Sequence, residues 1–242
     1  MKKCFVFTAL IMLSMLQVLS QSNRNNQIPL IGASAPSFSA MSTNGNVNFP
    51  ADFGANWKIL FAHPKDFTPV CSSELLELAY HQDSFDQLGA KILVLSTDKL
   101  DQHKVWKAAL EEINYKDREP VKIKFPLVDD HTYRVSNLYG MIHSQVSIGE
   151  NIRGVFIIDP ENKVRAIYYY PNEVGRNIDE LKRTLVALQT TNNRNIVTPA
   201  NWNPGDDVMV PVITASERES LGSPNSSLYE KSWFMIYKKN QE

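Results

Sequence analysis

Residues 61–75 read Phe61-Ala62-His63-Pro64-Lys65-Asp66-Phe67-Thr68-Pro69-Val70-Cys71-Ser72-Ser73-Glu74-Leu75. The apolar run 57–62 predicts a buried strand, and residues 74–88 carry apolar side chains at helical spacing. Thr68 is a good N-cap residue and Pro69 a good first helical residue, which places Cys71 at the third helical position. Free backbone N–H groups and the positive end of the helix dipole favour a thiolate there. The segment therefore predicts a reactive cysteine at a strand-loop-helix junction, against the alternative of a buried, inert one.

The composition is that of an ordinary soluble globular protein. Of the 242 residues, 43% are hydrophobic and 21% are charged, and the formal net charge is -1. A chain of this length holds one large domain or two unequal ones. Since no basic face and no glycine-rich phosphate loop stand out, we expect no nucleic acid partner.

The first twenty residues differ from the rest. Lys2 and Lys3 precede an apolar run over residues 5–19, and Ser20 offers a small residue at a cleavage point. This pattern is typical of a secretory signal peptide, which predicts a protein that is secreted or lies in a secretory-pathway lumen. The alternative is a membrane anchor, but the run is short for one, so we expect no stable membrane span.

Cleavage after residue 20 would leave one cysteine. The chain has two, Cys4 and Cys71, and Cys4 lies within the predicted signal peptide. An oxidising compartment normally favours structural disulfides. None could form inside the mature chain, so Cys71 must be a free thiol or pair with another molecule.

The remaining pattern predicts a polar, disordered tail over residues 21–27 and then alternating strands and helices. A ribbon over 35–42 and 47–53 flanks Asn44-Gly45. We expect strands at 57–62, 91–97, 125–129, 154–158 and 164–170, and helices at 74–88, 100–113, 131–139 and 177–189, with a loop at 141–151. Val105, Trp106, Ala109 and Leu110 should form the inner face of the helix at 100–113. A polar linker near residues 190–195 separates a small second domain over residues 196–242.

The order β-α-β-α, then a β-hairpin and a final helix, is the thioredoxin-like α/β plan for residues 28–190. Thioredoxins carry C-x-x-C at the first helix, and Val70-Cys71-Ser72-Ser73-Glu74 has no second cysteine. Disulfide exchange by that route is therefore excluded.

Pro64-x-x-x-Thr68-x-x-Cys71 within residues 61–71 closely resembles the peroxidatic loop of the one-cysteine peroxiredoxins, the peroxiredoxin 6-like group. Residues 197–202 and 205–210 resemble the C-terminal extension of that group. The resemblance implies a thiol-dependent peroxidase that reduces hydrogen peroxide or alkyl hydroperoxides through a sulfenic acid. It further implies a homodimer. Because the mature chain would hold no second cysteine, the reductant must come from outside, as a thiol or another donor, and we expect no cofactor or metal.

Three residues of this segment are predicted to carry the reaction. Cys71 supplies the nucleophile. Thr68, one helical turn earlier, would place a hydroxyl where it can hydrogen-bond the peroxide oxygens, although a plain N-cap role is compatible with the same position. Pro64 would contribute a rigid apolar wall without a competing N–H.

A fixed cation should complete the site, because the planar fork of arginine contacts two oxygens together. Arg153 matches the family's active-site arginine, against the alternative of a solvated strand end. Arg176 resembles the second arginine near the pocket, or could cap a loop. His63 stands where one-cysteine relatives carry histidine, and it could either hydrogen-bond near Cys71 or be a packed core residue.

One family trait is absent. Some members carry a lipase-like G-x-S-x-G before this strand, whereas this chain has Asn56 at the serine position and Pro50 where a histidine is expected. Asparagine cannot act as that acyl nucleophile, so phospholipase activity by this mechanism is not expected. The alternative function is a secreted thioredoxin-fold binding or holdase protein with a vestigial site, and peroxide turnover with added thiol separates the two.

Overall fold

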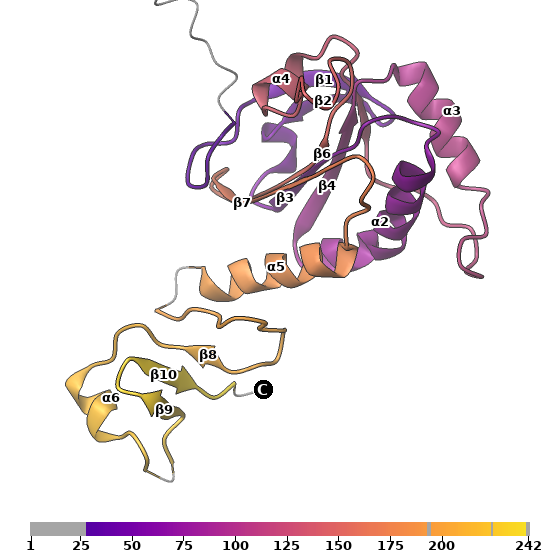
Figure 1. The fold of residues 1–242 in the computed structure, drawn as a ribbon. Coiled ribbons are helices and arrows are strands. Elements are labelled where there is room, and N and C mark those ends of the chain that lie inside the picture. The colour runs from indigo at the N-terminus through magenta and orange to yellow at the C-terminus, as the bar shows by residue number, and fades with distance from the viewer. Residues whose placement is uncertain (1–27, 193–194, 224, 241–242) are drawn as a thin grey trace, which may run out of the picture.

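The computed structural model describes residues 28–192, 195–223 and 225–240. The predicted signal peptide, the predicted tail and Cys4 lie outside them. The described chain forms a seven-stranded sheet with flanking helices and a separate three-stranded sheet (Figure 1). The elements of the larger part are β1 (Phe38–Ser42), β2 (Gly45–Phe49), η1 (Ala51–Phe53), β3 (Trp57–Ala62), α2 (Pro69–Gln87), β4 (Ala90–Ser96), α3 (Leu100–Leu110), β5 (Leu127–Asp129), α4 (Arg134–Leu138), β6 (Arg153–Ile158), β7 (Val164–Tyr170) and α5 (Ile178–Thr191).

The large sheet has the strand order β2-β1-β5-β4-β3-β6-β7. Strand β3 lies at its centre, parallel to β4 and antiparallel to β6. β4 and β5 are also parallel, whereas β6 and β7 form the predicted antiparallel hairpin. This arrangement confirms the thioredoxin-like α/β fold, and it brings the loop after β3 next to the first residue of β6.

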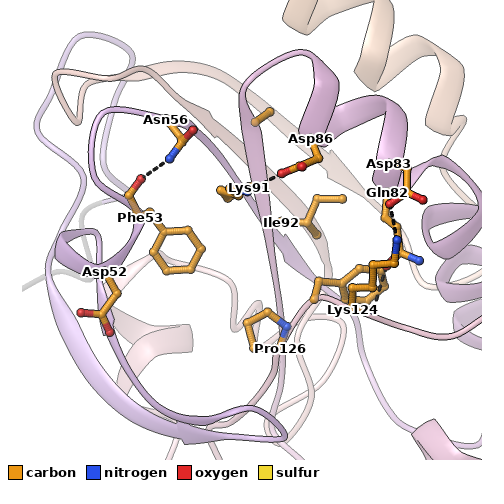
Figure 2. Close-up of a pocket in the computed structure, with 12 residues that line it drawn as sticks. Asp52, Phe53, Asn56, Gln82, Asp83, Asp86, Lys91, Ile92, Lys124 and Pro126 are labelled. Atoms are coloured by element: carbon orange, nitrogen blue, oxygen red, sulfur yellow. Dashed lines mark hydrogen bonds and ion pairs between the residues drawn. The ribbon is translucent and has the colours of Figure 1, made fainter.

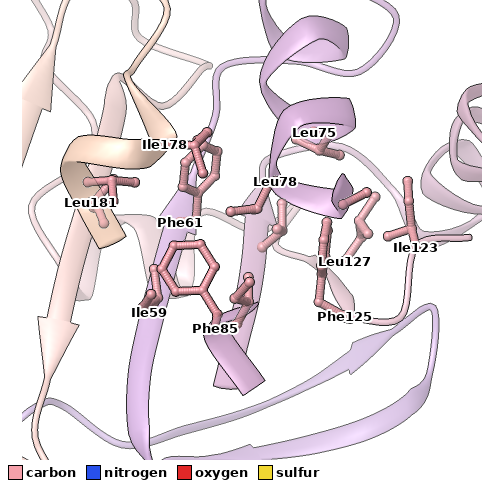
Figure 3. Packing of buried hydrophobic residues seen from close by; sticks show 14 of the residues in the cluster. Ile59, Phe61, Leu75, Leu78, Phe85, Ile123, Phe125, Leu127, Ile178 and Leu181 are labelled. Carbon is pink, nitrogen blue, oxygen red and sulfur yellow. The ribbon is translucent and has the colours of Figure 1, made fainter. Parts of the chain in front are cut away.

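The core has one layer on each face of this sheet. On the first face, side chains of β3 such as Ile59 and Phe61 pack against Leu75 and Leu78 of α2 and Leu181 of α5 (Figure 3). The second layer joins β1, β2 and α4 to the opposite side chains of the same strands. Every residue of β3 is buried, Lys58 included, as predicted for a buried strand.

Several predicted boundaries of helices and strands were wrong. The turn of the N-terminal ribbon is Thr43-Asn44, because Ser42 pairs with Gly45. Its second strand ends at Phe49, and the chain then forms the short helix η1. Helix α4 begins at Arg134 rather than at residue 131, because the carboxylate of Asp130 accepts the first free helical N–H groups, those of Val135 and Ser136, at 2.9 and 2.7 Å.

The predicted inner face of α3 was also wrong in part. Trp106 and Leu110 are buried, but Val105 is 63% exposed and Ala109 is exposed. His103 fills the inner position instead and is fully buried. Apolar character therefore identified the helix, but not which side of it faces the sheet.

Residues 195–223 and 225–240 include a small β-domain that confirms the predicted C-terminal extension. Its elements are β8 (Val208–Met209), α6 (Ala215–Glu219), β9 (Leu228–Ser232) and β10 (Met235–Lys238). The strand order is β8-β10-β9, and the core of Val210, Leu228 and Ile236 is small. This domain, in yellow, lies beside α5 in Figure 1, and Arg183 of α5 donates a hydrogen bond to the Trp202 carbonyl at 2.9 Å.

Within the described residues, no helix is both long and apolar enough to cross a membrane.

Candidate active site

Cys71 lies at the third position of α2, as the sequence predicted. Thr68 is the N-cap residue and Pro69 the first helical residue, and the thiol of Cys71 is completely buried. The Thr68 side chain does not cap the helix, however, because its hydroxyl donates to the Lys65 carbonyl at 3.1 Å. The positive end of α2 therefore acts on Cys71, and the Thr68 hydroxyl is held within the loop.

Arg153 is the first residue of β6 and contacts the sulfur directly. Its Nη1 donates to Cys71 Sγ at 3.3 Å and to Glu74 Oε2 at 2.7 Å. Its Nε and Nη2 donate to the Asn172 carbonyl at 3.0 and 2.6 Å. The side chain is 3% exposed, so the alternative of a solvated strand end was wrong. Four hydrogen bonds thus fix a cation against the thiol.

Arg176 is buried beside this pair but makes no hydrogen bond to Cys71 in the described chain. Its backbone N–H and Nε donate to Glu74 Oε1 at 2.7 and 2.8 Å, and its Nη2 donates to Glu74 Oε2 at 2.7 Å. Its Nη1 donates to the carbonyls of Ala62 and Gly154, and the guanidinium lies 3.4 Å from the centre of the Phe61 ring. Arg176 therefore holds Glu74, and its charge also interacts with Cys71.

Glu74 joins both arginines and was not predicted as a site residue. Burial by itself raises the pKa of Glu74, but the hydrogen bonds and charge of Arg176, together with the charge of Arg153, bring it below its ordinary value. Two buried guanidinium groups thus face one carboxylate. A thiolate at Cys71 would balance the remaining positive charge, which gives a second reason, besides the helix dipole, for an ionised sulfur.

A sequence signal for Glu74 did exist. It lies three residues after Cys71, so a helix places both on one face, and a carboxylate on the buried face of a helix needs cationic partners. Arg153 was already expected nearby, and Arg176 was expected either there or as a loop cap. The missing information was which of the helix neighbours each arginine would reach.

His63 and Pro64 are buried in the loop between β3 and α2. The His63 imidazole has no hydrogen-bond partner in the described chain, and its Nε2 lies 3.7 Å from Asp66 Oδ1. Its ring centre lies 5.1 Å from that of Trp106. Burial lowers the pKa of His63 to about 4, so the imidazole is neutral at neutral pH. Its two ring nitrogens remain unused in this state.

A hollow of about 430 Å³ opens at the end of the central strands away from Cys71, near the starts of β3 and β4 (Figure 2). Phe53, Ile92 and Phe125 are among the residues that line it. Its lysines are already paired, Lys91 with Asp86 and Lys124 with Asp83. Asn56 also lines it and donates to the Phe53 carbonyl at 2.8 Å. None of the residues around Cys71 lines this hollow.

The described residues hold no cluster of His, Cys, Asp and Glu that could bind a metal ion.

Two family models match the chain: the AhpC/TSA family over residues 31–167, and the C-terminal domain of 1-Cys peroxiredoxin over residues 187–220. A peroxiredoxin of Methanosarcina mazei is 42% identical over 218 residues, covering 89% of this chain and 100% of that protein. A peroxiredoxin of Thermotoga maritima is 39% identical over 219 residues, covering 88% of this chain and 98% of that protein.

Two solved structures are similar over the same span. The yeast mitochondrial 1-Cys peroxiredoxin, whose thiol is resolved via glutathione/thioredoxin systems, has a TM-score of 0.77 at 34% identity, covering 87% of this chain and 99% of its own. A cysteine-to-serine mutant of peroxiredoxin 6 of Arenicola marina has a TM-score of 0.77 at 31% identity, covering 88% and 99%. Both similarities extend well beyond the large sheet.

Proposed function

Because this chain belongs to the peroxiredoxin (AhpC/TSA) family and is a thiol-dependent peroxidase, we propose that Cys71 is its single peroxidatic cysteine. The observation that carries this assignment is the 3.3 Å hydrogen bond from Arg153 Nη1 to Cys71 Sγ. A buried thiol beside a fixed guanidinium, at the start of a helix, has the surroundings that stabilise a thiolate nucleophile.

The reaction follows from this arrangement. The Cys71 thiolate attacks one peroxide oxygen, an S–O bond forms and the O–O bond breaks. The departing oxygen takes the electron pair and a proton and leaves as water or as an alcohol. Arg153 has donors that can turn to the peroxide oxygens, and the Thr68 hydroxyl would add another. Pro64 would exclude water, and both hydrogen peroxide and organic hydroperoxides are substrates of this mechanism.

The auxiliary residues have different roles in this proposal. Arg176 is a positioning residue, because its contacts fix Glu74, which in turn holds Arg153. The ring nitrogens of His63 are free, so one of them could accept a hydrogen bond from the O–H group of a Cys71 sulfenic acid. Cys71 would have to move towards His63 for this bond to form. The packed-histidine alternative for His63 stays open.

We propose that an external thiol regenerates the enzyme. Cys71 is the sole cysteine among the described residues, and the chain's other cysteine, Cys4, lies in the predicted signal peptide. An internal disulfide would therefore need a cysteine that export removes. The yeast relative, which uses glutathione/thioredoxin systems, supports a small thiol or a protein thiol as the reductant.

Export and dimerisation complete the proposal. The basic start and apolar run of residues 1–20 support removal of a signal peptide and a location outside the cytosol. N-terminal sequencing of natively expressed protein should start near residue 21, and a start at Met1 would contradict export. Light scattering of the purified protein should give the mass of two chains, since the family resemblance implies a homodimer.

The test of the peroxidase assignment is turnover. We expect the wild-type protein with added thiol to consume many equivalents of hydrogen peroxide, and Cys71→Ser to consume none. The matched control is Ser73→Ala, which changes a half-buried residue of the same helix turn. Consumption of a single equivalent, or activity retained by Cys71→Ser, would favour the binding or holdase alternative.

A further inference from the structure

A buried ion pair holds the loop that leads to Cys71. His103, from α3, is fully buried, and its Nδ1 lies 2.8 Å from Asp66 Oδ2. Its Nε2 lies 3.0 Å from the carbonyl oxygen of Val128 in β5. Asp66 is 2% exposed and stands midway between β3 and α2. One imidazole therefore ties this loop to both the sheet and α3.

The contacts decide the protonation of this imidazole. A carbonyl oxygen can only accept, so Nε2 must carry a proton, and an ionised Asp66 requires a proton on Nδ1 as well. Burial lowers the pKa of His103, but the hydrogen bond and charge of Asp66, the Val128 carbonyl and Asp98 raise it more, and the net effect is upward. Among the described residues, Asp98 and His63 are the other titratable groups that face the pair, and His63 is neutral. When Asp66 is ionised, both ring nitrogens of His103 thus act as donors, one to the Asp66 carboxylate and one to the Val128 carbonyl.

Asp66 is fixed by its backbone as well. Its N–H donates to Asp98 Oδ2 at 2.8 Å, and that oxygen also accepts from the Ser96 hydroxyl at 2.8 Å. The next residue, Phe67, adopts a left-handed backbone (φ 57°) and is 53% exposed. Such a conformation is strained for a residue other than glycine, and the half-exposed Phe67 ring contacts Trp106 of α3. The loop therefore depends on the anchor at Asp66.

We propose that Asp66 and His103 are positioning residues for the peroxidase reaction, holding Thr68 and Cys71 in their reacting arrangement without touching the peroxide. The proposal rests on the assignment of Cys71 as the peroxidatic cysteine. In this proposal the reactivity of Cys71 on α2 depends on the charge of His103 on α3.

The pair has a definite pH dependence. Because the pKa of His103 is raised above its unfolded value of about 6.5, the pair is fully formed below that pH and is lost as the pH rises through the folded value. The rate of Cys71 oxidation should therefore decline at alkaline pH as His103 loses its proton.

Asp66→Asn separates the charge from the hydrogen bonds. The amide can donate to Nδ1 of a neutral imidazole while Nε2 continues to donate to Val128, so the loop stays anchored over the whole range. We expect this variant to lack the alkaline decline. His103→Phe removes both bonds and should lower the oxidation rate about 10- to 100-fold, since misplacing a reacting group by about 1 Å costs about 100-fold. His131→Gln is the matched control, because His131 pairs with Asp129 at 2.6 Å at a half-exposed site.

The measurement is the second-order rate constant of Cys71 oxidation by hydrogen peroxide as a function of pH. An alkaline decline that persists unchanged in Asp66→Asn, or is missing from the wild type, would overturn the proposal. Nitrogen NMR of the imidazole rings, tractable with five histidines, should show two protonated nitrogens on His103 at neutral pH. A neutral His103 in this spectrum would also overturn the proposal. The NMR test uses the wild-type protein, so it does not depend on whether His103→Phe folds.

Failure of the peroxidase assignment would look different. A wild-type Cys71 that does not react with peroxide would contradict the proposed function, whatever the state of His103. The effect of the Asp66–His103 pair on the loop would then be measured by the rate at which iodoacetamide alkylates Cys71 in the same variants. Equal alkylation profiles in the wild type and Asp66→Asn would count against the positioning role.

Discussion

Arg153 is the residue on which the reactivity of Cys71 depends most directly. Its Nη1 contacts both Sγ and Glu74 Oε2. Arg153→Ala removes the charge next to the sulfur, and Arg153→Lys replaces a planar fork by a single ammonium that cannot make the same set of bonds. We expect both variants to slow Cys71 oxidation by hydrogen peroxide about 100-fold, the usual effect of removing one preorganised donor. Stopped-flow kinetics measure the oxidation rate. The control is Arg165→Lys, because Arg165 forms a partly exposed ion pair with Asp159.

The same variants test the charge balance around the thiol. With Arg153 gone, Arg176 and Glu74 neutralise each other, and the buried site no longer favours a negative sulfur. Alkylation of Cys71 at neutral pH should therefore be slower in Arg153→Ala. Alkylation at the wild-type rate would mean that the helix dipole alone sustains the thiolate.

Glu74 should matter more for stability than an ordinary carboxylate. Glu74→Gln leaves two buried guanidinium groups facing a neutral amide, and breaking a buried ion pair in this way costs about 3–5 kcal/mol. Glu77→Gln is the control, because Glu77 lies one turn further along α2 and pairs with the more exposed Lys116 and Arg118. Its loss should cost about 1 kcal/mol or less. Urea denaturation at neutral pH measures both changes.

The pH dependence of the Glu74 effect has a fixed sign. The pKa of Glu74 is depressed in the folded protein, so its contribution is present above the unfolded value of about 4.3 and is lost as the pH falls through the folded value. The stability difference between the wild type and Glu74→Gln should shrink on acidification. A difference that is constant down to low pH would show that the carboxylate charge is not what stabilises this cluster.

Among the individual residues of the site, the sequence predicted Cys71, Arg153 and Arg176 but not Glu74 or Asp66. A cysteine at a helix start and an arginine at a strand start are visible as local patterns. Glu74 and Asp66 take their roles from partners 79 and 37 residues away in the chain, Arg153 and His103. No spacing rule reports such a partner, because it depends on how strands and helices pack.

Helix α3 shows the same limit for a whole element. Its existence followed from the pattern, whereas its orientation did not, since Val105 and Ala109 face outward and His103 faces the sheet. Apolar side chains stand on more than one side of this helix. The buried imidazole is tolerated because Asp66 and Val128 satisfy both of its nitrogens.

This orientation is testable by truncating side chains on opposite faces of α3. Leu110→Ala should cost about 2–5 kcal/mol, because Leu110 is 1% exposed within the core. Val105→Ala should change stability by less than about 0.5 kcal/mol, since a solvent-facing methyl group has few contacts to lose. Chemical denaturation measures the free energy of unfolding of the two variants and so shows which face of α3 packs on the core. Equal losses would mean that the helix is rotated about its axis, with Val105 facing the core.

The central strands were predicted almost to the residue, and the reason is physical. A strand covered on both faces reads as a mostly apolar run, as β3 and β4 do apart from Lys58 and Lys91, and its ends lie within about a residue of the ends of that run. Elements whose ends depend on side-chain contacts were predicted less well. The start of α4 is an example, because the Asp130 carboxylate and the left-handed Tyr133 set it.

For the molecule as a whole, the number of cysteines limits the possible catalytic cycle. Cys71 is buried, and in the described chain no second thiol is present to condense with a sulfenic acid. Where a resolving cysteine exists, the sulfenic acid is trapped quickly as a disulfide. If Cys4 is removed with the signal peptide, as proposed, the sulfenic acid must wait for a reductant to reach the loop from outside.

Excess peroxide without a thiol should therefore carry Cys71 past the sulfenic acid. We expect the peptide that contains Cys71 to gain about one, then two or three oxygen atoms, with activity lost permanently at the second step. Glutathione added before the peroxide should prevent the second and third additions, because it reduces the first product as it forms. Intact-mass and peptide mass spectrometry on the wild type measure this, with Cys71→Ser as the control that should gain none there. A stable disulfide between the Cys71 residues of two chains as the main product would contradict this cycle, because it would make a second copy of the chain the reductant.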